Sequence, residues 1–243
     1  MKYLVFSDVH ANLEAVQAFC AVIRNIDHDK KVCLGDMVGY CADPNPVVDW
    51  LRKEVDLGIA GNHDLAVLGS IPTYDFNPYA VQSCVWTRKV LSPENKEYLN
   101  SLPLIREEDD ICWVHASPFE PKEWHYVLSK HDGKQNFDAF NASVCFLGHS
   151  HRPLVLEQNS NSRINGYVFP RKVQLEPDHR YIFNVGSLGQ PRDGVAQPSF
   201  VVYDSGARTV EFYRFGYDYS PTQEKILTQS LPPFFAERLA YGM

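Results

Sequence analysis

Residues 3–10 read YLVFSDVH, an apolar run that passes directly into a polar loop. Such a short apolar run, rich in β-branched and aromatic residues, is typical of a buried β-strand. Asp8 and His10 follow it at once, which indicates a first strand rather than a secretory signal peptide. Because ligands bind at the carboxyl ends of strands in open α/β sheets, the same residues predict the beginning of a site.

The same succession of apolar run and polar loop recurs four times before residue 152. The expected strands cover residues 31–34, 57–60, 111–114 and 143–147, and they are followed by Asp36, Asn62, His63, His115, His149 and His151. Residues 13–26, with Asn12 as the expected N-cap, and residues 46–54 have helical spacing. This alternation predicts parallel strands with right-handed crossovers, so that the polar loops meet at one edge.

The second half of the chain has a different pattern. Short β-branched or aromatic segments cover residues 154–157, 163–169, 172–175, 181–185, 199–203 and 209–215, with turn residues at Asn165-Gly166 and Ser205-Gly206. This half is expected to be mostly antiparallel. Residues 77–101, 134–140 and 222–239 are expected to be helical, the last with a break at Pro232-Pro233. Without a repeat or a long linker, the sequence predicts one domain, 1–243, with a helical tail over 220–243.

Composition excludes several classes of function. Lys and Arg number 23 and Asp and Glu 30 in 243 residues, giving a net charge of −7 and no broad nucleic-acid surface. No stretch approaches the ~18 apolar residues of a membrane span. Six cysteines occur without a CxxC pair, so we expect free thiols and a cytoplasmic protein.

The polar residues at the strand ends suggest a metal site. One histidine at a strand end is usually incidental, but five, with two aspartates and an amide, are hard to explain by chance. Imidazole and carboxylate suit manganese, iron and zinc and argue against calcium. Asp8 and His10 can turn toward one ion, whereas His149 and His151 could serve two adjacent ions, with Asp36 placed to bridge them. Two ions ~3.5–4 Å apart clamp the attacking and leaving oxygens at phosphorus.

Five motifs carry a resemblance to a known family. Asp8-Val9-His10, Gly35-Asp36, Gly61-Asn62-His63-Asp64, His115 and Gly148-His149-Ser150-His151 occur in that order. Together they resemble the signature of the calcineurin-like metallophosphoesterase superfamily over residues 1–151, and Asn184-Val185-Gly186-Ser187 extends the resemblance to 187. The loop over residues 35–40 and Gly189-Gln190-Pro191-Arg192 resemble those of the small, cap-less prokaryotic phosphodiesterases.

The resemblance implies a fold and a set of roles. The fold would be α/β (α+β), a four-layer αββα sandwich of two mixed β-sheets flanked by helices. The first ion would take Asp8, His10, Asp36 and His151, and the second would take Asp36, Asn62, His115 and His149. His63 would contact the phosphate and protonate the leaving oxygen, with Asp64 orienting its imidazole.

The implied reaction is hydrolysis of phosphodiesters, with phosphomonoesters as a further substrate, by a hydroxide that bridges two divalent ions. Manganese is the expected metal, and iron, zinc, nickel and cobalt are alternatives. With both ions, two carboxylates and the hydroxide, the site would carry a charge of about +1, which attracts phosphate. The substrate is expected to be a small phosphoester, with a nucleotide as the leading candidate.

Three further residues are candidates for substrate contacts. Arg192 could neutralise a substrate oxygen, Asn12 could contact substrate near the first motif, and Tyr40 could wall a pocket. Each has a structural alternative: a surface arginine, an N-cap and a packing anchor. The other aromatic candidates for pocket walls are Phe76, Tyr79, Trp124 and His125.

Alternative functions remain open at this point. A dinucleoside polyphosphate hydrolase would use the same chemistry at phosphorus, and a nuclease is disfavoured by the acidic charge. A non-catalytic metal-binding scaffold would not need His63 and Asp64. Gly39-Tyr40 and Asp64 depart from the protein serine/threonine phosphatase branch, and neither GxSxG, GxxxxGK nor GxGxxG occurs. Oligomeric state is not determined by the sequence.

Overall fold

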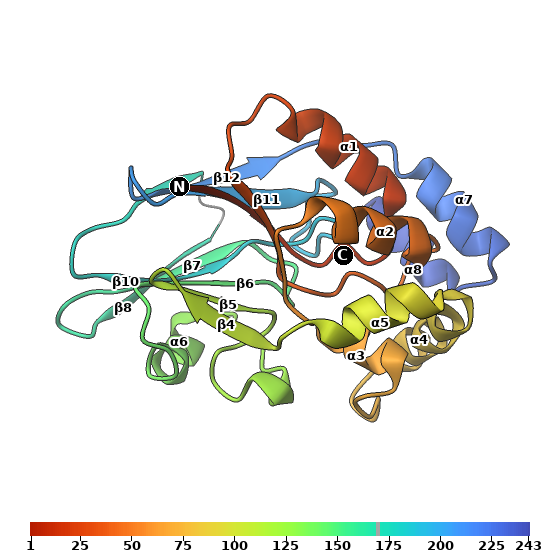
Figure 1. Cartoon of the computed structure of the whole chain (residues 1–243), viewed down its shortest axis with the longest axis horizontal. Helices are drawn as coiled ribbons and strands as arrows, with labels where there is room; N and C mark the ends of the chain where they lie inside the picture. Colours follow the sequence, from red (N-terminus) through yellow and green to blue (C-terminus); the bar gives the residue numbers. More distant parts are fainter. Residues whose placement is uncertain (169–170) are drawn as a thin grey trace.

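Strand β1, the first apolar run, lies near the middle of a six-stranded sheet in a computed structural model that describes residues 1–168 and 171–243 (Figure 1). The strand order is β3-β2-β1-β11-β12-β9. Neighbours β1, β2 and β3 are parallel, whereas β11, β12 and β9 continue the sheet in antiparallel pairs. The strands are β1 (Lys2–Phe6), β2 (Lys30–Cys33), β3 (Leu57–Gly58), β9 (Lys172–Gln174), β11 (Ser199–Asp204) and β12 (Thr209–Arg214).

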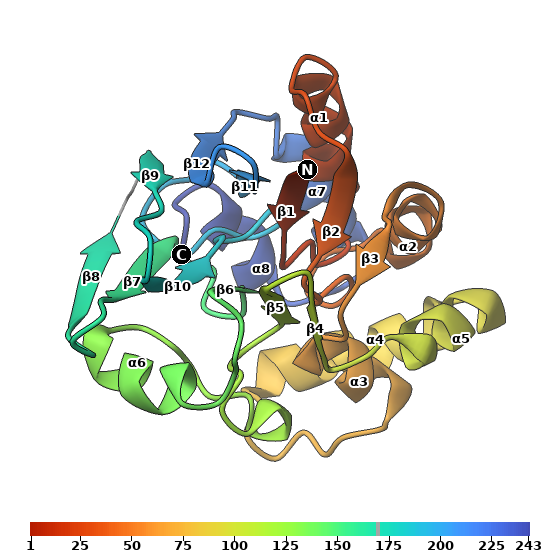
Figure 2. The same cartoon turned by 60° about the vertical axis from the view of Figure 1, so that its left-hand side comes forward.

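A second six-stranded sheet packs against the first, with the order β4-β5-β6-β10-β7-β8 (Figure 2). Here β5, β6 and β10 are parallel, and β4, β7 and β8 are antiparallel to their neighbours. The strands are β4 (Ile105–Glu108), β5 (Ile111–Val114), β6 (Val144–Leu147), β7 (Leu154–Gln158), β8 (Ile164–Val168) and β10 (Arg180–Asn184). Both sheets are therefore mixed, as the sequence and its family resemblance predicted.

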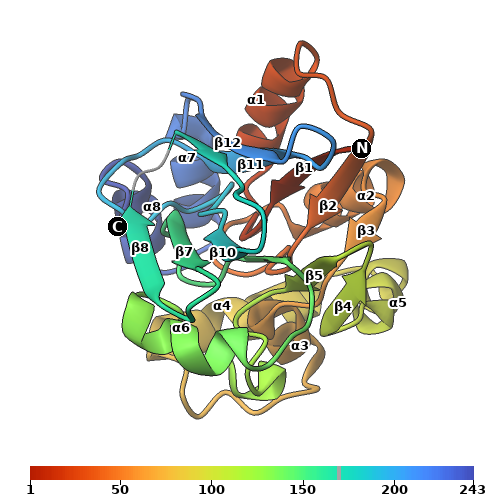
Figure 3. The same ribbon diagram turned by 90° about the vertical axis from the view of Figure 1, so that its left-hand side faces the viewer.

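Helices cover the outer faces of the two sheets, so the molecule has four layers, αββα (Figure 3). Helices α1 to α5 pack mainly on the first sheet, α6 covers the second, and α7 and α8 pack against each other beside α1. Their bounds are α1 (Leu13–Ile23), α2 (Pro44–Glu54), α3 (Asn62–Leu68), α4 (Pro78–Val90), α5 (Pro93–Ser101), α6 (Lys130–Phe137), α7 (Ser220–Thr228) and α8 (Pro233–Leu239), with a 3₁₀ turn at Pro121–Glu123. Within the described residues, no helix has the length and apolar character needed to cross a membrane.

Alternation along β1 explains why the two sheets stack. Leu4 and Phe6 face the helices, whereas Tyr3 and Val5 face the second sheet. Since successive side chains of a strand point to opposite faces, an apolar residue at every position buries both faces. Trp113, which is fully buried, fills the space between the sheets and stacks on Phe146 with a ring-centroid distance of 5.2 Å.

Helix boundaries follow from capping residues. The Asn12 side chain accepts a hydrogen bond from Ala15 N at 3.1 Å, which confirms it as the N-cap of α1. The helical region expected over 77–101 is divided into α4 and α5 because Ser92 caps a new helix and Pro93 cannot donate to the preceding turn.

Several expectations about elements need correction. Strand β4 was not among the expected strands, because three of its four residues are charged, and Asp109 and Asp110 form the turn that follows it. Asn165-Gly166 lies within β8 rather than in a turn. The expected helix over 134–140 lies at Lys130–Phe137, since Ser129 and Asp132 form a capping box there. The strand expected over 163–169 is Ile164–Val168, and Phe169 lies outside the described residues.

Candidate metal centre

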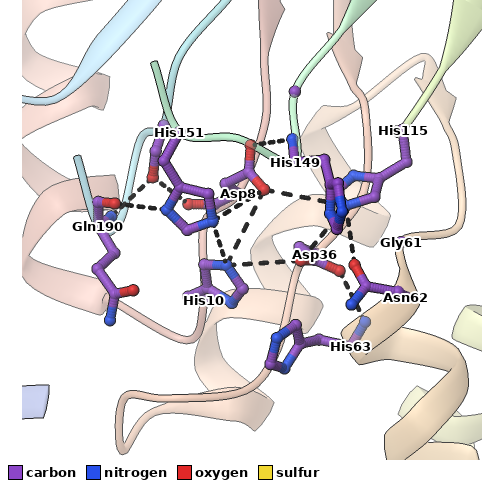
Figure 4. Close-up of polar contacts among 12 residues, drawn as sticks. Asp8, His10, Asp36, Gly61, Asn62, His63, His115, His149, His151 and Gln190 are labelled. Carbon is purple, nitrogen blue, oxygen red and sulfur yellow. Dashed lines mark hydrogen bonds and ion pairs between the residues drawn. The ribbon is translucent and has the colours of Figure 1, made fainter. Parts of the chain in front are cut away.

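The loops that follow the strands of both sheets meet at one place (Figure 4). Asp8 and His10 follow β1, Asp36 follows β2, His115 follows β5, and His149 and His151 follow β6. Asn62 and His63 begin α3, just after β3. The contacts that join the two sheets here include His149 N to Asp8 Oδ2 at 3.0 Å and His115 Nδ1 to Leu34 O at 2.7 Å. Predicted metal ligands from five loops are thus brought together and are all buried.

The backbone of these loops is unusual. Residues with positive φ include five of the predicted ligands: Asp8, His10, Asp36, His149 and His151. Non-glycine residues adopt this region infrequently, and surrounding contacts must hold them there. The bonds from Asp8 N to Gly35 O at 3.0 Å and from His10 N to Asp36 O at 2.9 Å supply such contacts. A Cβ at Gly61 or Gly148 would collide with the aspartate side chains, so glycine allows the loops to approach this closely.

One group of facing side chains consists of Asp8, His10, Asp36 and His151, whose ligand atoms all lie within 4.8 Å of one another. His10 Nε2 lies 3.1 Å from His151 Nε2 and 3.6 Å from Asp36 Oδ2. His151 Nε2 lies 3.3 Å from Asp8 Oδ1. These atoms come from three loops, yet they converge on one point.

A second group shares Asp36 with the first. Ligand atoms of Asp36, His115 and His149 also lie within 4.8 Å of one another. His115 Nε2 is 3.3 Å from Asp36 Oδ2 and 3.2 Å from Asn62 Oδ1. The predicted position of Asp36 between two sets of donors is therefore the one observed.

Main-chain carbonyls orient three of the imidazoles. Nδ1 of His10 lies 3.0 Å from Val38 O, Nδ1 of His115 lies 2.7 Å from Leu34 O, and Nδ1 of His151 lies 2.5 Å from Gln190 O. Because a carbonyl can only accept, each Nδ1 carries a proton and each Nε2 points to the centre. His10 and His151 present the lone pair of Nε2 there, and His115 does so once its Nε2 has lost a proton. This is the arrangement found for metal-binding histidines.

The donor atoms therefore fit divalent metal ions. Nε2 of His10 and Nε2 of His151 would face each other lone pair to lone pair, and Asp8 Oδ1 is a buried oxygen without a hydrogen-bond partner among the described residues. Buried acceptors without a donor are costly, and a cation between them removes that cost. Imidazole, carboxylate and amide oxygen, with no thiolate, suit ions such as manganese, iron and zinc.

The pKa values of the side chains in the centre also favour bound cations. Burial raises the pKa of Asp8 to about 7, which shows how strongly an unneutralised carboxylate is disfavoured there. Burial also opposes ionisation of His115, but the charge of Asp36 and its hydrogen bond outweigh it and raise the pKa of His115 to about 9. Burial lowers the pKa of His149 to about 3. In the metal-free chain, a proton on His115 thus partly compensates the carboxylates where cations would otherwise do so.

His63 lies beside these two groups. Its main-chain N donates to Asp36 Oδ1 at 2.8 Å. The centroid of its ring lies 4.4 Å from that of Tyr40 and 5.0 Å from that of His10. Nδ1 of His63 is 3.8 Å from Cys84 Sγ. Burial lowers the pKa of His63 to about 4, so the ring is neutral in the free protein. The ring lines a cavity next to the candidate ligands.

The prediction that Asp64 orients the His63 imidazole is wrong. Asp64 Oδ1 accepts hydrogen bonds from Met37 N at 2.9 Å and Val38 N at 3.2 Å, and Oδ2 accepts one from Gly61 N at 2.9 Å. The carboxylate therefore joins two loops through their backbone amides. The sequence could not distinguish these roles, because an aspartate next to a histidine can point to either partner.

The cavity beside His63 has a volume of about 460 Å³ and an aromatic wall. Tyr40, Phe76 and Trp124 line it, as expected, whereas Tyr79 and His125 do not. Tyr126, which the sequence analysis did not single out, stacks on His149 with ring centroids 4.2 Å apart and planes 17° apart. We call this space, with Tyr40, Phe76, Trp124 and Tyr126 in its wall, the aromatic cavity.

The remaining candidates for substrate contacts are placed differently. Asn12 is fully buried, its Nδ2 donates to Gly189 O at 2.8 Å and Tyr217 OH at 2.9 Å, and it cannot reach a substrate. The prediction of a substrate role for Asn12 is therefore wrong, because its N-cap and packing roles use all its polar atoms. Arg192 is half-buried at the edge of the site, with its guanidinium carbon 5.4 Å from the centre of the Tyr40 ring.

Known proteins match most or all of this chain. A family model for the calcineurin-like phosphoesterase superfamily domain matches residues 1–207. An uncharacterised protein of Methanocaldococcus jannaschii is 39% identical over 98% of this chain and 97% of its own length. The crystal structure of a metallophosphoesterase from Sphaerobacter thermophilus is 34% identical, covers 100% of this chain and 99% of its own, and superimposes with a TM-score of 0.89. A hypothetical protein from Pyrococcus horikoshii, at 18% identity and a TM-score of 0.82 over 100% of this chain and 98% of its own, has the same fold.

Proposed function

Because the chain belongs to the calcineurin-like phosphoesterase superfamily, we propose that it hydrolyses phosphodiester bonds with two divalent metal ions. Phosphomonoesters would be secondary substrates. The observation that carries the proposal is the convergence of two groups of buried acceptor atoms that share Asp36. Metallophosphoesterase membership alone implies hydrolysis of a phosphoester, and the shared carboxylate supports a centre with two ions.

The proposed ligands follow the two groups. Asp8, His10, Asp36 and His151 would hold one ion, and Asp36, Asn62, His115 and His149 would hold the other. When bound, a pair of divalent ions makes water a nucleophile near neutral pH and neutralises charge on phosphate oxygens. Manganese is the expected metal, and iron, zinc, nickel or cobalt would suit the same donors.

The main chain holds the proposed metal ligands in fixed orientations. Carbonyls of Leu34, Val38 and Gln190 fix three imidazoles with Nε2 inward before any ligand binds. Ligands that are already oriented need no reorganisation during the reaction. The Asp64 carboxylate contributes by holding the loop of Met37 and Val38 against the loop of Gly61.

His63 is proposed to donate the proton to the leaving oxygen. It lies outside both groups and lines the aromatic cavity, so a phosphoester there would contact its ring. The thiol of Cys84 faces Nδ1, which leaves Nε2 for the substrate. A neutral imidazole with its proton on Nε2 can donate that proton directly to the leaving oxygen.

The aromatic cavity supports a small organic substrate, with a nucleotide as the leading candidate. The rings of Phe76, Trp124 and Tyr126 offer faces on which a planar base can stack. The net charge of −7 disfavours a long nucleic acid. All six cysteines are free thiols, which suits a reducing compartment such as the cytoplasm.

A dinucleoside polyphosphate hydrolase is the alternative enzyme, because the reaction at phosphorus is the same. A non-catalytic metal-binding scaffold is the alternative from another class. The position of His63 in the cavity argues against the scaffold, since holding a metal requires no proton donor beside it.

Turnover of bis(p-nitrophenyl) phosphate tests the proposal. Metal-stripped protein should be inactive, and added manganese should restore turnover. His63→Gln should lose most of this activity, whereas His131→Gln, an exposed histidine of α6, should keep it. Manganese-loaded wild-type protein that hydrolyses neither this diester nor p-nitrophenyl phosphate would favour the scaffold.

A further inference from the structure

A second cavity, of about 720 Å³, lies on the other side of the turn that carries His149 and His151. His149 lines the aromatic cavity, whereas the next residue, Ser150, lines this one. In the same way, Tyr126 lines the aromatic cavity and Val127 lines the second. The two cavities therefore flank the candidate metal centre from neighbouring positions in the chain.

Three arginines line the second cavity: Arg152, Arg192 and Arg238. They come from separate segments, after β6, after β10 and from α8, that meet at this cavity. Arg192 also reaches toward the other cavity, since its guanidinium lies over the ring of Tyr40. We call the second cavity, with these three side chains in its wall, the arginine pocket.

Other contacts position the arginines and neutralise only one of them. Arg152 Nε donates to Arg192 O at 2.8 Å, and Arg192 Nη2 donates to Gln190 Oε1 at 2.9 Å, and both acceptors are neutral. Arg238 Nε donates to a carboxylate oxygen of Met243, the last residue of the sequence, and its guanidinium carbon lies 5.1 Å from the centre of the Phe234 ring. Between residues 1–168 and 171–243, no side-chain carboxylate forms an ion pair with any of the three.

The acidic side chain of the pocket does not neutralise Arg152 or Arg192. Asp193 lines the arginine pocket, but its carboxylate pairs with Arg214, outside the pocket. Burial and then the charge of Arg192 lower the pKa of Arg238 to about 10, so Arg238 stays charged at neutral pH and is repelled by its neighbour. Like charges held together in a partly buried pocket are relieved by an anion.

We propose that the arginine pocket binds a second phosphate group of the substrate, separate from the phosphate that reacts at the metal centre. Planar guanidinium groups match phosphate oxygens in bidentate hydrogen bonds, and three of them can surround one phosphate. The inference rests on the proposed function and specifies its substrate class: a phosphoester that carries a further phosphate.

The apolar part of the pocket lining supports an organic phosphate. Val127, Leu128, Leu154 and Val168 also line the pocket. Cationic and apolar residues together suit a phosphate attached to an organic group better than free inorganic phosphate. A substrate could thus place one phosphate at the metal centre, a base in the aromatic cavity and a further phosphate in the arginine pocket.

Two nucleotides that differ by one phosphate test this inference. Adenosine 3′,5′-bisphosphate and adenosine 5′-monophosphate would be compared by calorimetry on the manganese-loaded protein, and as inhibitors of bis(p-nitrophenyl) phosphate turnover. The bisphosphate should bind about tenfold more tightly, as expected for additional charge-assisted hydrogen bonds. The ratio of the two affinities should fall toward one in Arg152→Gln and Arg238→Gln. It should be unchanged in Arg163→Gln, because Arg163 does not line the pocket.

The possible outcomes distinguish phosphate binding in the arginine pocket from hydrolysis at the metal centre. A ratio near one in the wild-type protein, or an unchanged ratio in both pocket variants, would overturn the inference. Absence of turnover, in contrast, would count against the proposed hydrolysis, while the calorimetric ratio would still decide whether the pocket binds the second phosphate. Because Arg152 and Arg238 are exposed or half-buried, two independent variants guard against a folding defect in one.

Discussion

The two halves of the candidate metal centre are held in different ways. In the half with Asp8, His10 and His151, both imidazoles are fixed by main-chain carbonyls, and all three side chains are at most 1% exposed. In the other half, His115 is likewise buried and fixed by Leu34 O, but Asn62 and His149 are each 6% exposed and line the aromatic cavity. His149 is supported by stacking on Tyr126.

Because of this difference, we expect the two halves to bind metal ions with different affinities. The side chains of the first half are almost fully buried, which suits tight binding of an ion. The second half opens toward the space where a phosphoester would bind. We therefore expect tighter binding of the ion in the first half and a stronger influence of the cavity wall on the second. Asp36 couples the halves, because its Oδ2 lies 3.6 Å from His10 Nε2 and 3.3 Å from His115 Nε2.

Asp36→Asn should have the largest effect, since it affects both halves. An amide of the same size removes the charge that both groups of imidazoles face. Manganese-dependent turnover of bis(p-nitrophenyl) phosphate should fall to the background rate. Asp138→Asn, at an exposed aspartate after α6, should retain wild-type turnover. Substantial activity in Asp36→Asn would show that the halves work independently.

His151→Gln and His149→Gln compare the halves directly. His149→Gln should leave the first half able to bind one ion per chain with nearly wild-type affinity. His151→Gln should weaken that tight site, because it removes a ligand fixed by Gln190 O. Calorimetric titration of the metal-stripped variants with manganese measures the affinity and the number of sites in each. Identical titrations for the two variants would contradict the proposed difference in manganese affinity between the halves.

His63→Gln should affect catalysis but not metal binding. Loss of a positioned proton donor typically costs about 10²- to 10⁴-fold in kcat. The variant should still bind the same number of ions, because His63 lies outside both groups of donors. If metal is lost together with turnover, His63 belongs among the ligands of the second half.

Tyr126→Leu should have the smallest effect and should be confined to the second half. Without the stack the His149 ring is less well oriented, and an aromatic pair of this kind typically contributes about 0.5–1.5 kcal/mol, which limits the loss of metal affinity to about tenfold. The weaker manganese site should show this change and the tighter one should not. Tyr74→Leu, at a residue 93% exposed, is the matched control. Equal weakening of both sites would contradict the assignment of Tyr126 to one half.

Much of the site could be predicted because it is encoded locally. Each strand end places a polar residue at a known edge of a sheet, and β1, with Asp8 and His10 after it, shows this within eight residues. Parallel pairing of β1, β2 and β3 followed from the helices between them.

What could not be predicted depends on contacts between distant segments. The carbonyl of Gln190 orients His151, and the Asp64 carboxylate accepts from amides 26 and 27 residues away. Tyr126 reaches His149 from a segment without regular structure. Asn165-Gly166 has the composition of a turn, but pairing with β7 keeps it in a strand, since tertiary contacts override local preference.

The number of ions bound per chain is the most direct test of a centre that shares Asp36. Wild-type protein and Asp36→Asn would be equilibrated with manganese, freed of excess metal and analysed by native mass spectrometry. We expect two ions on the wild-type chain and a loss of both in Asp36→Asn, with Asp138→Asn keeping two. One ion or none on the wild-type chain, or two ions retained by Asp36→Asn, would contradict a centre built around a shared carboxylate.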